Sequence, residues 1–171
     1  MNKKIILLFF TILLICIPFS PSFGQYRPNV FSIPAPDFSL YDIQGKMFKL
    51  SSQKGNPVVM FFGTTWCPAC RSEMPYYKAL YEKYAKQGLK FLYIDINEST
   101  KRVTRFAKEN SFPYLVLLDS DGSVANDYNI TGVPTLILVD KQGNIIGISH
   151  RTADLPLNNL FPTKKNNLKL L

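Results

Sequence analysis

Two cysteines separated by two residues, Cys67 and Cys70, are the side chains of this sequence best suited to chemistry. They lie in the run Trp66-Cys67-Pro68-Ala69-Cys70, and proline is favoured at the first position of a helix. A helix start offers unpaired backbone N–H groups and the positive end of the helix dipole, both of which stabilise a thiolate over a thiol. Cys67 is therefore predicted to be the attacking nucleophile. Cys70, one turn later, is predicted to be the less exposed residue that resolves a mixed disulfide.

Other uses of this cysteine pair are an inert disulfide, half of a zinc site, or a copper site. An inert disulfide between cysteines so close in sequence closes a very short loop and would constrain the unfolded chain little. A zinc site needs further ligands, and His150 is the sole histidine. Cu(I) held by Cys67, Cys70 and His150 is kept as an alternative, because Cu(I) prefers soft ligands. The redox role is favoured, with no metal and no cofactor beyond the redox-active Cys67–Cys70 disulfide itself.

The segments around the motif alternate in the order expected of an α/β domain. The apolar run at 58–62 predicts a buried central strand, and the following helix is expected to run from Pro68 to about Lys86, kinked at Pro75. Before this strand, the runs at 38–41 and 47–50 predict a β-hairpin with Gly45 in its turn. After the helix, strands are expected at 91–96, 114–118, 135–139 and 145–148, with helices at 99–110 and 123–128 and a brief final helix around 157–161.

The run from Trp66 to Cys70, together with Gly132-Val133-Pro134-Thr135, resembles the thioredoxin superfamily. The resemblance implies a thioredoxin-like α/β fold, in which helices flank a mixed central sheet, here with an N-terminal β-hairpin extension. It also implies that Pro134 is a cis-proline facing the cysteine pair. Val133 would then offer its backbone to a substrate segment as an added strand, and Trp66 would contribute to the same substrate-binding surface.

The exported TlpA/ResA-like branch, related to the AhpC/TSA proteins, is the nearer resemblance and covers roughly residues 34–150. It rests on the lead-in Pro36-Asp37-Phe38-Ser39-Leu40 and on the run from Cys70 to Pro75. Thioredoxin itself has a buried aspartate in the strand before the motif, where this chain has Phe61. Glu73 instead matches an acidic residue that this branch places near the cysteines. We expect it to accept a proton from Cys70, with an ordinary surface glutamate as the alternative.

The N-terminal 24 residues have the layout of a secretory signal peptide, with Lys3 and Lys4 ahead of an apolar run and a small-residue site at Ser22-Phe23-Gly24. The apolar run would span only about 20 Å as a helix, which is short of a bilayer of about 30 Å. Cleavage after Gly24 is expected; an uncleaved anchor and lipidation at Cys16 are the alternatives. The predicted organisation is then a signal peptide (1–24), an extended leader (25–35), a thioredoxin-like domain (36–162) and a basic C-terminal tail (163–171).

The favoured function is an extracytoplasmic thiol:disulfide oxidoreductase, secreted into the periplasm or its equivalent and free or tethered to the membrane. The resemblance implies that it reduces protein disulfides with electrons from a membrane-embedded donor, as in cytochrome c maturation. A disulfide-donating oxidase would use the same residues, and a peroxidase would use Thr64 beside Cys67. The net charge of +8 comes from scattered residues, so nucleic acid is not an expected partner. The sequence does not specify an oligomeric state.

Overall fold

The computed structural model describes residues 33–162. The predicted signal peptide, most of the predicted leader and the predicted tail at 163–171 lie outside these residues. Within 33–162, every helix is too short or too polar to cross a membrane.

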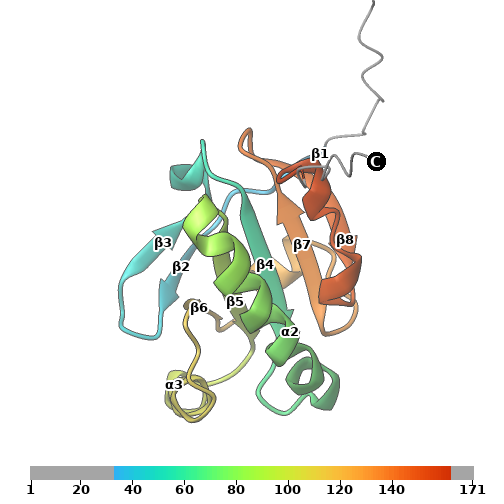
Figure 1. The fold of residues 1–171 in the computed structure, drawn as a ribbon. Helices are drawn as coiled ribbons and strands as arrows, with labels where there is room; N and C mark the ends of the chain where they lie inside the picture. Colours follow the sequence, from blue (N-terminus) through green and yellow to red (C-terminus); the bar gives the residue numbers. More distant parts are fainter. Residues whose placement is uncertain (1–32, 163–171) are drawn as a thin grey trace, which may run out of the picture. The chain divides into compact units, whose positions relative to one another are not determined.

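A mixed sheet of eight strands, in the order β1-β8-β7-β4-β5-β6-β2-β3, forms the centre of the domain (Figure 1). The strands are β1 (Ile33–Pro34), β2 (Ser39–Asp42), β3 (Met47–Lys49), β4 (Val58–Gly63), β5 (Lys90–Ile96), β6 (Leu115–Asp119), β7 (Thr135–Val139) and β8 (Asn144–Ser149). The central strands β4, β5 and β6 are parallel, and all other pairs are antiparallel. The predicted hairpin is β2–β3, which joins the sheet where β2 pairs with β6, and Gly45 in its turn has a positive φ of 81°. The leader's Ile33–Pro34 belongs to the sheet through its pairing with β8.

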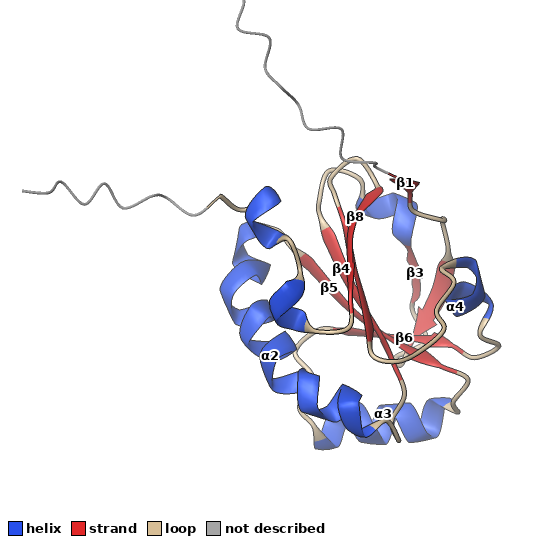
Figure 2. Ribbon diagram, turned by 90° about the vertical axis from the view of Figure 1, so that its right-hand side faces the viewer, coloured by secondary structure: helices blue, strands red, loops and turns tan. Residues whose placement is uncertain are grey.

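Strand β4 is buried on both faces, as its unbroken apolar sequence predicts. Its side chains alternate between two cores: Val59 and Phe61 lie in one, and Met60 and Phe62 lie in the other. The helices α2 (Pro68–Tyr84) and α3 (Thr100–Glu109) cover the first core, while α4 (Ser123–Asp127) covers the second, on the opposite face of the sheet (Figure 2). A strand held from both sides gives the motif that follows it a rigid base.

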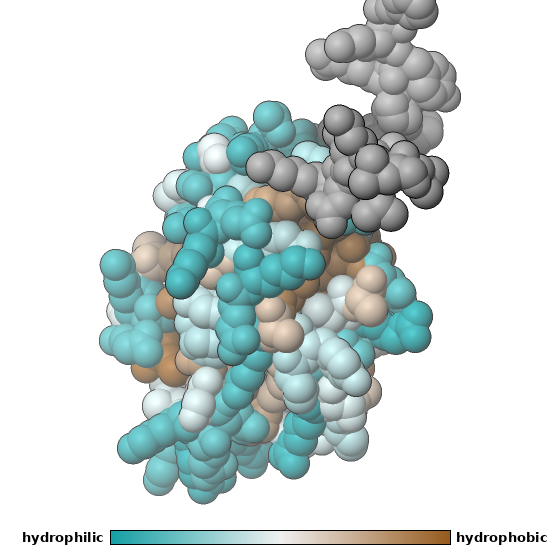
Figure 3. Space-filling view, viewed as in Figure 1, coloured by the Kyte–Doolittle hydropathy of each residue, from teal (hydrophilic) through white to brown (hydrophobic). Residues whose placement is uncertain are grey.

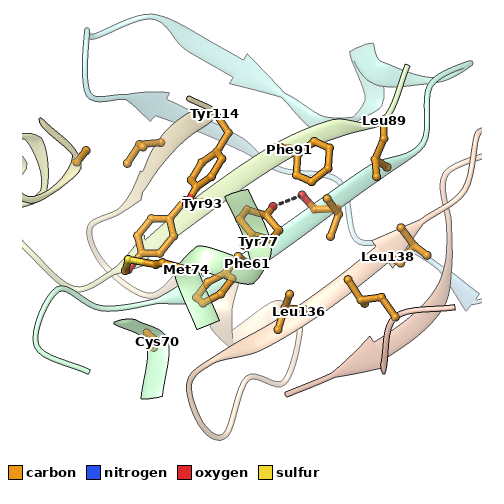
Figure 4. Close-up of a cluster of buried hydrophobic side chains, with 14 of the residues drawn as sticks. Phe61, Cys70, Met74, Tyr77, Leu89, Phe91, Tyr93, Tyr114, Leu136 and Leu138 are labelled. Carbon is orange, nitrogen blue, oxygen red and sulfur yellow. Dashed lines mark hydrogen bonds between the residues drawn. The ribbon is translucent and has the colours of Figure 1, made fainter. Parts of the chain in front are cut away.

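Helix α2 begins with Cys67 as its N-cap residue and leads through a 3-10 turn, η2 (Ala85–Gln87), to Gly88 with a φ of 93°. Its apolar stripe packs into the core, where Tyr77 is fully buried. The Tyr77 hydroxyl lies 3.0 Å from the carbonyl oxygen of Val59 on β4 and 2.9 Å from that of Leu92 on β5. Figure 4 draws one of these two contacts as a dashed line from Tyr77. Since a hydroxyl has one proton, it donates to one of these carbonyls at a time. The helix that carries the cysteines is thereby tied to two central strands.

The predicted final helix is wrong in type, because the chain forms two 3-10 turns, η3 (Thr152–Asp154) and η4 (Leu157–Asn159), instead of an α-helix. Pro156 and Pro162 bracket the second turn, and proline neither continues a helix nor supplies a backbone donor. Leu155 and Leu157 are nevertheless buried in the core beneath α2. The short 3-10 helix η1 (Leu50–Gln53) follows the hairpin and adds Leu50 to the opposite core. The predicted thioredoxin-like fold with its hairpin extension is confirmed.

Candidate active site

Cys67 and Cys70 lie where β4 passes into α2, and the structure joins them in a disulfide with a Cα–Cα distance of 5.3 Å. The backbone N–H of Cys70 points at the Cys67 sulfur, with a nitrogen–sulfur distance of 3.0 Å. After reduction the same N–H would donate to a Cys67 thiolate, at the positive end of the α2 dipole. Cys67 is 4% exposed and Cys70 is fully buried, an order of accessibility that suits the predicted attacking and resolving roles. Figure 4 places Cys70 at one end of the buried cluster.

The loop before β7 brings a second backbone segment to the cysteines. The Val133–Pro134 peptide bond is cis, and the carbonyl oxygen of Val133 lies 3.7 Å from the Cys67 sulfur. Within the loop, the hydroxyl of Thr135 donates to the carbonyl of Gly132 at 2.7 Å. His150 Nδ1 lies 2.8 Å from the carbonyl oxygen of Pro134, so this nitrogen is assigned the ring proton. The main chain of Val133 therefore lies next to the Cys67 sulfur.

A cleft of about 450 Å³ opens beside this loop, between Trp66 and Val133. Trp66 is 65% exposed, which is unusual for so large an apolar side chain. Amide and hydroxyl side chains line much of the remaining wall, namely those of Thr64, Asn97, Asn126 and Thr131. On the face drawn in Figure 3, hydrophilic side chains dominate and hydrophobic surface shows between them. The cleft offers an exposed aromatic ring and polar groups next to Val133, although neither cysteine lines it.

Glu73 lies on α2, and its carboxylate makes a contact that the sequence does not predict. Its Oε2 accepts a hydrogen bond from the backbone N–H of Thr152 at 2.8 Å, which fastens η3 to the helix. Among residues 33–162, neither cysteine is hydrogen-bonded to Glu73. The contact with Thr152 does not test whether Glu73 accepts a proton from Cys70, and that role stays a prediction.

The three residues of the copper alternative are not gathered into one site. The ring of His150 is engaged with the carbonyl of Pro134. Within the described part of the chain, no cluster of three or more His, Cys, Asp or Glu side chains could hold a metal ion. With the cysteines joined in a disulfide and His150 in contact with the Pro134 carbonyl, the copper alternative stays a prediction.

The turn that leads into the motif is held by charged side chains that sequence reasoning missed. Glu98 accepts two hydrogen bonds from Thr65, from its backbone N–H to Oε2 at 2.5 Å and from its hydroxyl to Oε1 at 2.7 Å. Arg71 donates to the carbonyl oxygen of Thr65 through Nε at 3.1 Å and Nη2 at 2.7 Å. The signal that could have indicated this cluster is Asp95, an acidic residue inside an otherwise apolar strand.

Asp95 and Glu98 have opposite pKa shifts. Burial raises the pKa of Asp95 to about 8, and the neighbouring negative charge of Glu98 adds to the shift. Asp95 is 1% exposed, and its carboxyl oxygens have no hydrogen-bond partner within 33–162. Burial also opposes ionisation of Glu98, but the hydrogen bonds from Thr65 and Arg102 outweigh it and lower its pKa. At neutral pH this pair therefore holds one charged and one protonated carboxyl group.

Comparison with known proteins supports the resemblance drawn from the motifs. Residues 32–148 match the AhpC/TSA family. The thiol-disulfide oxidoreductase ResA of Geobacillus kaustophilus is 38% identical over 111 residues, which are 65% of this chain and 64% of that protein. The chain thus spans slightly less than two thirds of the length of this curated relative.

Two solved structures are also similar to this chain. A thiol:disulfide interchange protein of the thioredoxin family from Chlorobium tepidum is 32% identical with a TM-score of 0.64, covering 72% of this chain and 90% of its own. The thioredoxin domain of a thiol-disulfide oxidoreductase from Bacteroides vulgatus is 27% identical with a TM-score of 0.68, covering 75% and 93%.

The raised pKa of Asp95 predicts a pH-dependent stability. Between about pH 4 and pH 8 the unfolded chain releases this proton while the folded protein keeps it, so the free energy of unfolding falls as pH rises. Asp95→Asn removes this titration. We compare the free energy of unfolding of the variant with that of the native protein at each pH. The variant should gain about 2 kcal/mol or more over the native protein between pH 5 and pH 8. Urea unfolding of the oxidised proteins at both pH values measures the difference.

Asp127→Asn, on the exposed side of α4, is the matched control for this measurement and should change stability by less than about 0.5 kcal/mol at either pH. An effect of Asp95→Asn that is the same at pH 5 and pH 8 would contradict a titrating Asp95.

Proposed function

Because the chain belongs to the AhpC/TSA family, we propose that it is a thiol:disulfide oxidoreductase that reduces protein disulfides through Cys67 and Cys70. The observation that carries the proposal is the Cys70 N–H aimed at the Cys67 sulfur, with the Val133 main chain beside it. This combination stabilises a thiolate and leaves a backbone segment next to it for docking. The relatives from Geobacillus kaustophilus and Bacteroides vulgatus are thiol-disulfide oxidoreductases, which supports the same chemistry.

The proposed reaction transfers two electrons from the reduced cysteine pair to a substrate disulfide. The Cys67 thiolate attacks one substrate sulfur, which forms a mixed disulfide and releases the other substrate sulfur as a thiolate that takes up a proton. Cys70 then loses its proton and attacks the Cys67 sulfur. This step forms the Cys67–Cys70 disulfide and releases the second substrate thiol. A separate electron donor must reduce the disulfide again.

Trp66, Val133 and Pro134 are proposed as the substrate-binding surface. An extended substrate segment would pair with the main chain of Val133, and the exposed ring of Trp66 would cover the segment next to it. Glu73 is proposed as the group that takes the proton of Cys70, after releasing the Thr152 N–H or while still accepting it.

Export and the electron donor are proposed from the sequence. The charged start, apolar run and small-residue site at Ser22-Phe23-Gly24 support secretion by a signal peptide into the periplasm or its equivalent. In such an oxidising compartment a reductase needs electrons from elsewhere, which supports a membrane-embedded donor as partner.

The cysteine roles predict different outcomes for the two serine variants. Cys67→Ser is expected to abolish reduction of a protein disulfide, because the thiol that remains, Cys70, is fully buried. Cys70→Ser is expected to accumulate the mixed disulfide between Cys67 and the substrate, because the resolving step is lost. Turbidity of insulin under dithiothreitol measures the activity, and non-reducing electrophoresis detects the mixed disulfide. Undiminished activity of Cys67→Ser would refute the proposed nucleophile.

The direction of electron flow follows from the reduction potential of the Cys67–Cys70 pair. Equilibration of the native protein with dithiothreitol buffers should give a value near or below about −230 mV, in the range of reducing thioredoxin-like proteins. A value near about −120 mV would make the pair a disulfide donor and would replace the reductase by an oxidase.

The role proposed for Glu73 predicts a slow resolving step in Glu73→Gln. The reduced protein should react with 5,5′-dithiobis(2-nitrobenzoate) in two phases, first at Cys67 and then as Cys70 displaces the second nitrothiolate. We expect the second phase to slow by about tenfold or more at pH 7, because general-base catalysis contributes at least this much. The amide oxygen introduced by Glu73→Gln can still accept the Thr152 N–H, so η3 should stay in place.

Glu82→Gln, an exposed position of the same helix, is the matched control and should leave both phases unchanged. An unchanged second phase in Glu73→Gln would assign Glu73 to the attachment of η3 alone.

A further inference from the structure

Glu98 holds the turn before the cysteine motif, and we propose that it is a positioning residue that sets the reactivity of Cys67 through Thr65. The inference rests on the proposed role of Cys67 as nucleophile. It assigns to Glu98 no contact with substrate and no part in proton transfer.

The hydrogen bonds of Thr65 leave this residue little freedom. Its N–H and hydroxyl both donate to the Glu98 carboxylate, and its carbonyl accepts from the guanidinium of Arg71. Thr65 is 6% exposed and Glu98 is 9% exposed, so water competes weakly for these bonds. A negative group on one side and a positive group on the other thus fix both polar ends of one peptide segment, two residues before Cys67.

The two charged groups come from different parts of the fold. Glu98 lies in the connection between β5 and α3, and Arg71 lies in the first turns of α2. Arg102 on α3 supports Glu98 from the other side, with 3.3 Å between its Nη1 and Oε1 of Glu98. A charge-assisted hydrogen bond is about twice as strong as a neutral one. Side chains that follow β5 or lie on α3 and α2 therefore fix the position of the turn, in addition to the strand that precedes it.

The position of the Cys67 sulfur depends on this turn. The Cys67 backbone N–H lies 3.4 Å from the carbonyl oxygen of Thr64, the residue before Thr65. From there the sulfur reaches the Cys70 N–H at 3.0 Å and the Val133 carbonyl at 3.7 Å. Hydrogen-bond strength falls steeply as geometry worsens. A looser turn would let the sulfur move away from the start of α2, which would raise the pKa of its thiol.

A second effect of Glu98 has the opposite sign and makes the proposal testable. As a nearby negative charge it disfavours a thiolate, so its neutralisation alone would lower the pKa of the Cys67 thiol, or would leave that pKa unchanged where Asp95, whose pKa Glu98 raises, ionises in its place. Loss of positioning would raise that pKa. The direction of the change in a neutral variant therefore separates the two effects.

The experiment measures the rate at which iodoacetamide alkylates Cys67 in the reduced full-length chain, from pH 4 to pH 10. For Glu98→Gln we expect the thiol pKa to rise by about one pH unit, with alkylation at pH 6 slowed about threefold or more. The reduction potential should move to a more reducing value, because the reduced form loses thiolate stabilisation. Thr65→Val should shift the pKa in the same direction by less, since the backbone bond to Glu98 remains. Thr65→Ser, which keeps the hydroxyl, should behave as the native protein.

A control variant and the result with Thr65→Val complete the test of Glu98. Glu109→Gln removes an exposed carboxylate of α3, paired with Arg105 at 3.9 Å, and should leave the thiol pKa unchanged. A lowered or unchanged thiol pKa in folded Glu98→Gln would overturn the proposal. If Glu98→Gln does not fold, an unchanged pKa in Thr65→Val would overturn it and a raised one would support it. Alkylation needs no substrate disulfide, so a protein inactive toward disulfides would contradict the proposed function without affecting this result.

Discussion

The contact between the Cys70 N–H and the Cys67 sulfur depends on how the surrounding strands and helix are held in place. It exists only while Cys67 caps α2, and the cap holds its place because β4 is buried between two cores. Tyr77 ties the same helix to β4 and β5. A cysteine on a mobile loop would meet this N–H only part of the time and would gain less thiolate character.

The antiparallel pairing of β4 with β7 explains how distant residues meet at the sulfur. Phe62, near the end of β4, is paired with Thr135 at the start of β7. The loop that ends in Val133 and Pro134 therefore lies beside the turn that begins after Gly63. His150, at the end of β8, reaches the same loop because β8 runs antiparallel to β7. The sheet register thus assembles the site from three separate segments.

Buried charge is the least expected feature of this domain. Glu98 stays ionised although it is buried, because Thr65 and Arg102 donate hydrogen bonds to its carboxylate. Asp95 beside it is protonated at neutral pH, because burial raises its pKa. Removing charged groups from water is costly unless they are paired and hydrogen-bonded. The buried charge of Glu98 is hydrogen-bonded to Thr65, two residues before Cys67, the proposed nucleophile.

Local sequence was sufficient for the order of elements, for the buried strand β4, and for a helical segment that starts at Pro68 and, through η2, ends before Gly88, because periodicity, proline and glycine act over a few residues. It also indicated Cys67 and Cys70, while the Val133–Pro134 loop was indicated by the resemblance to the thioredoxin superfamily. Tertiary structure alone decided that Glu73 accepts the Thr152 N–H, that His150 contacts the Pro134 carbonyl, and that Glu98 binds Thr65. These contacts join residues 16 to 79 positions apart in the chain, and long side chains choose such partners only after the sheet register has set their distances.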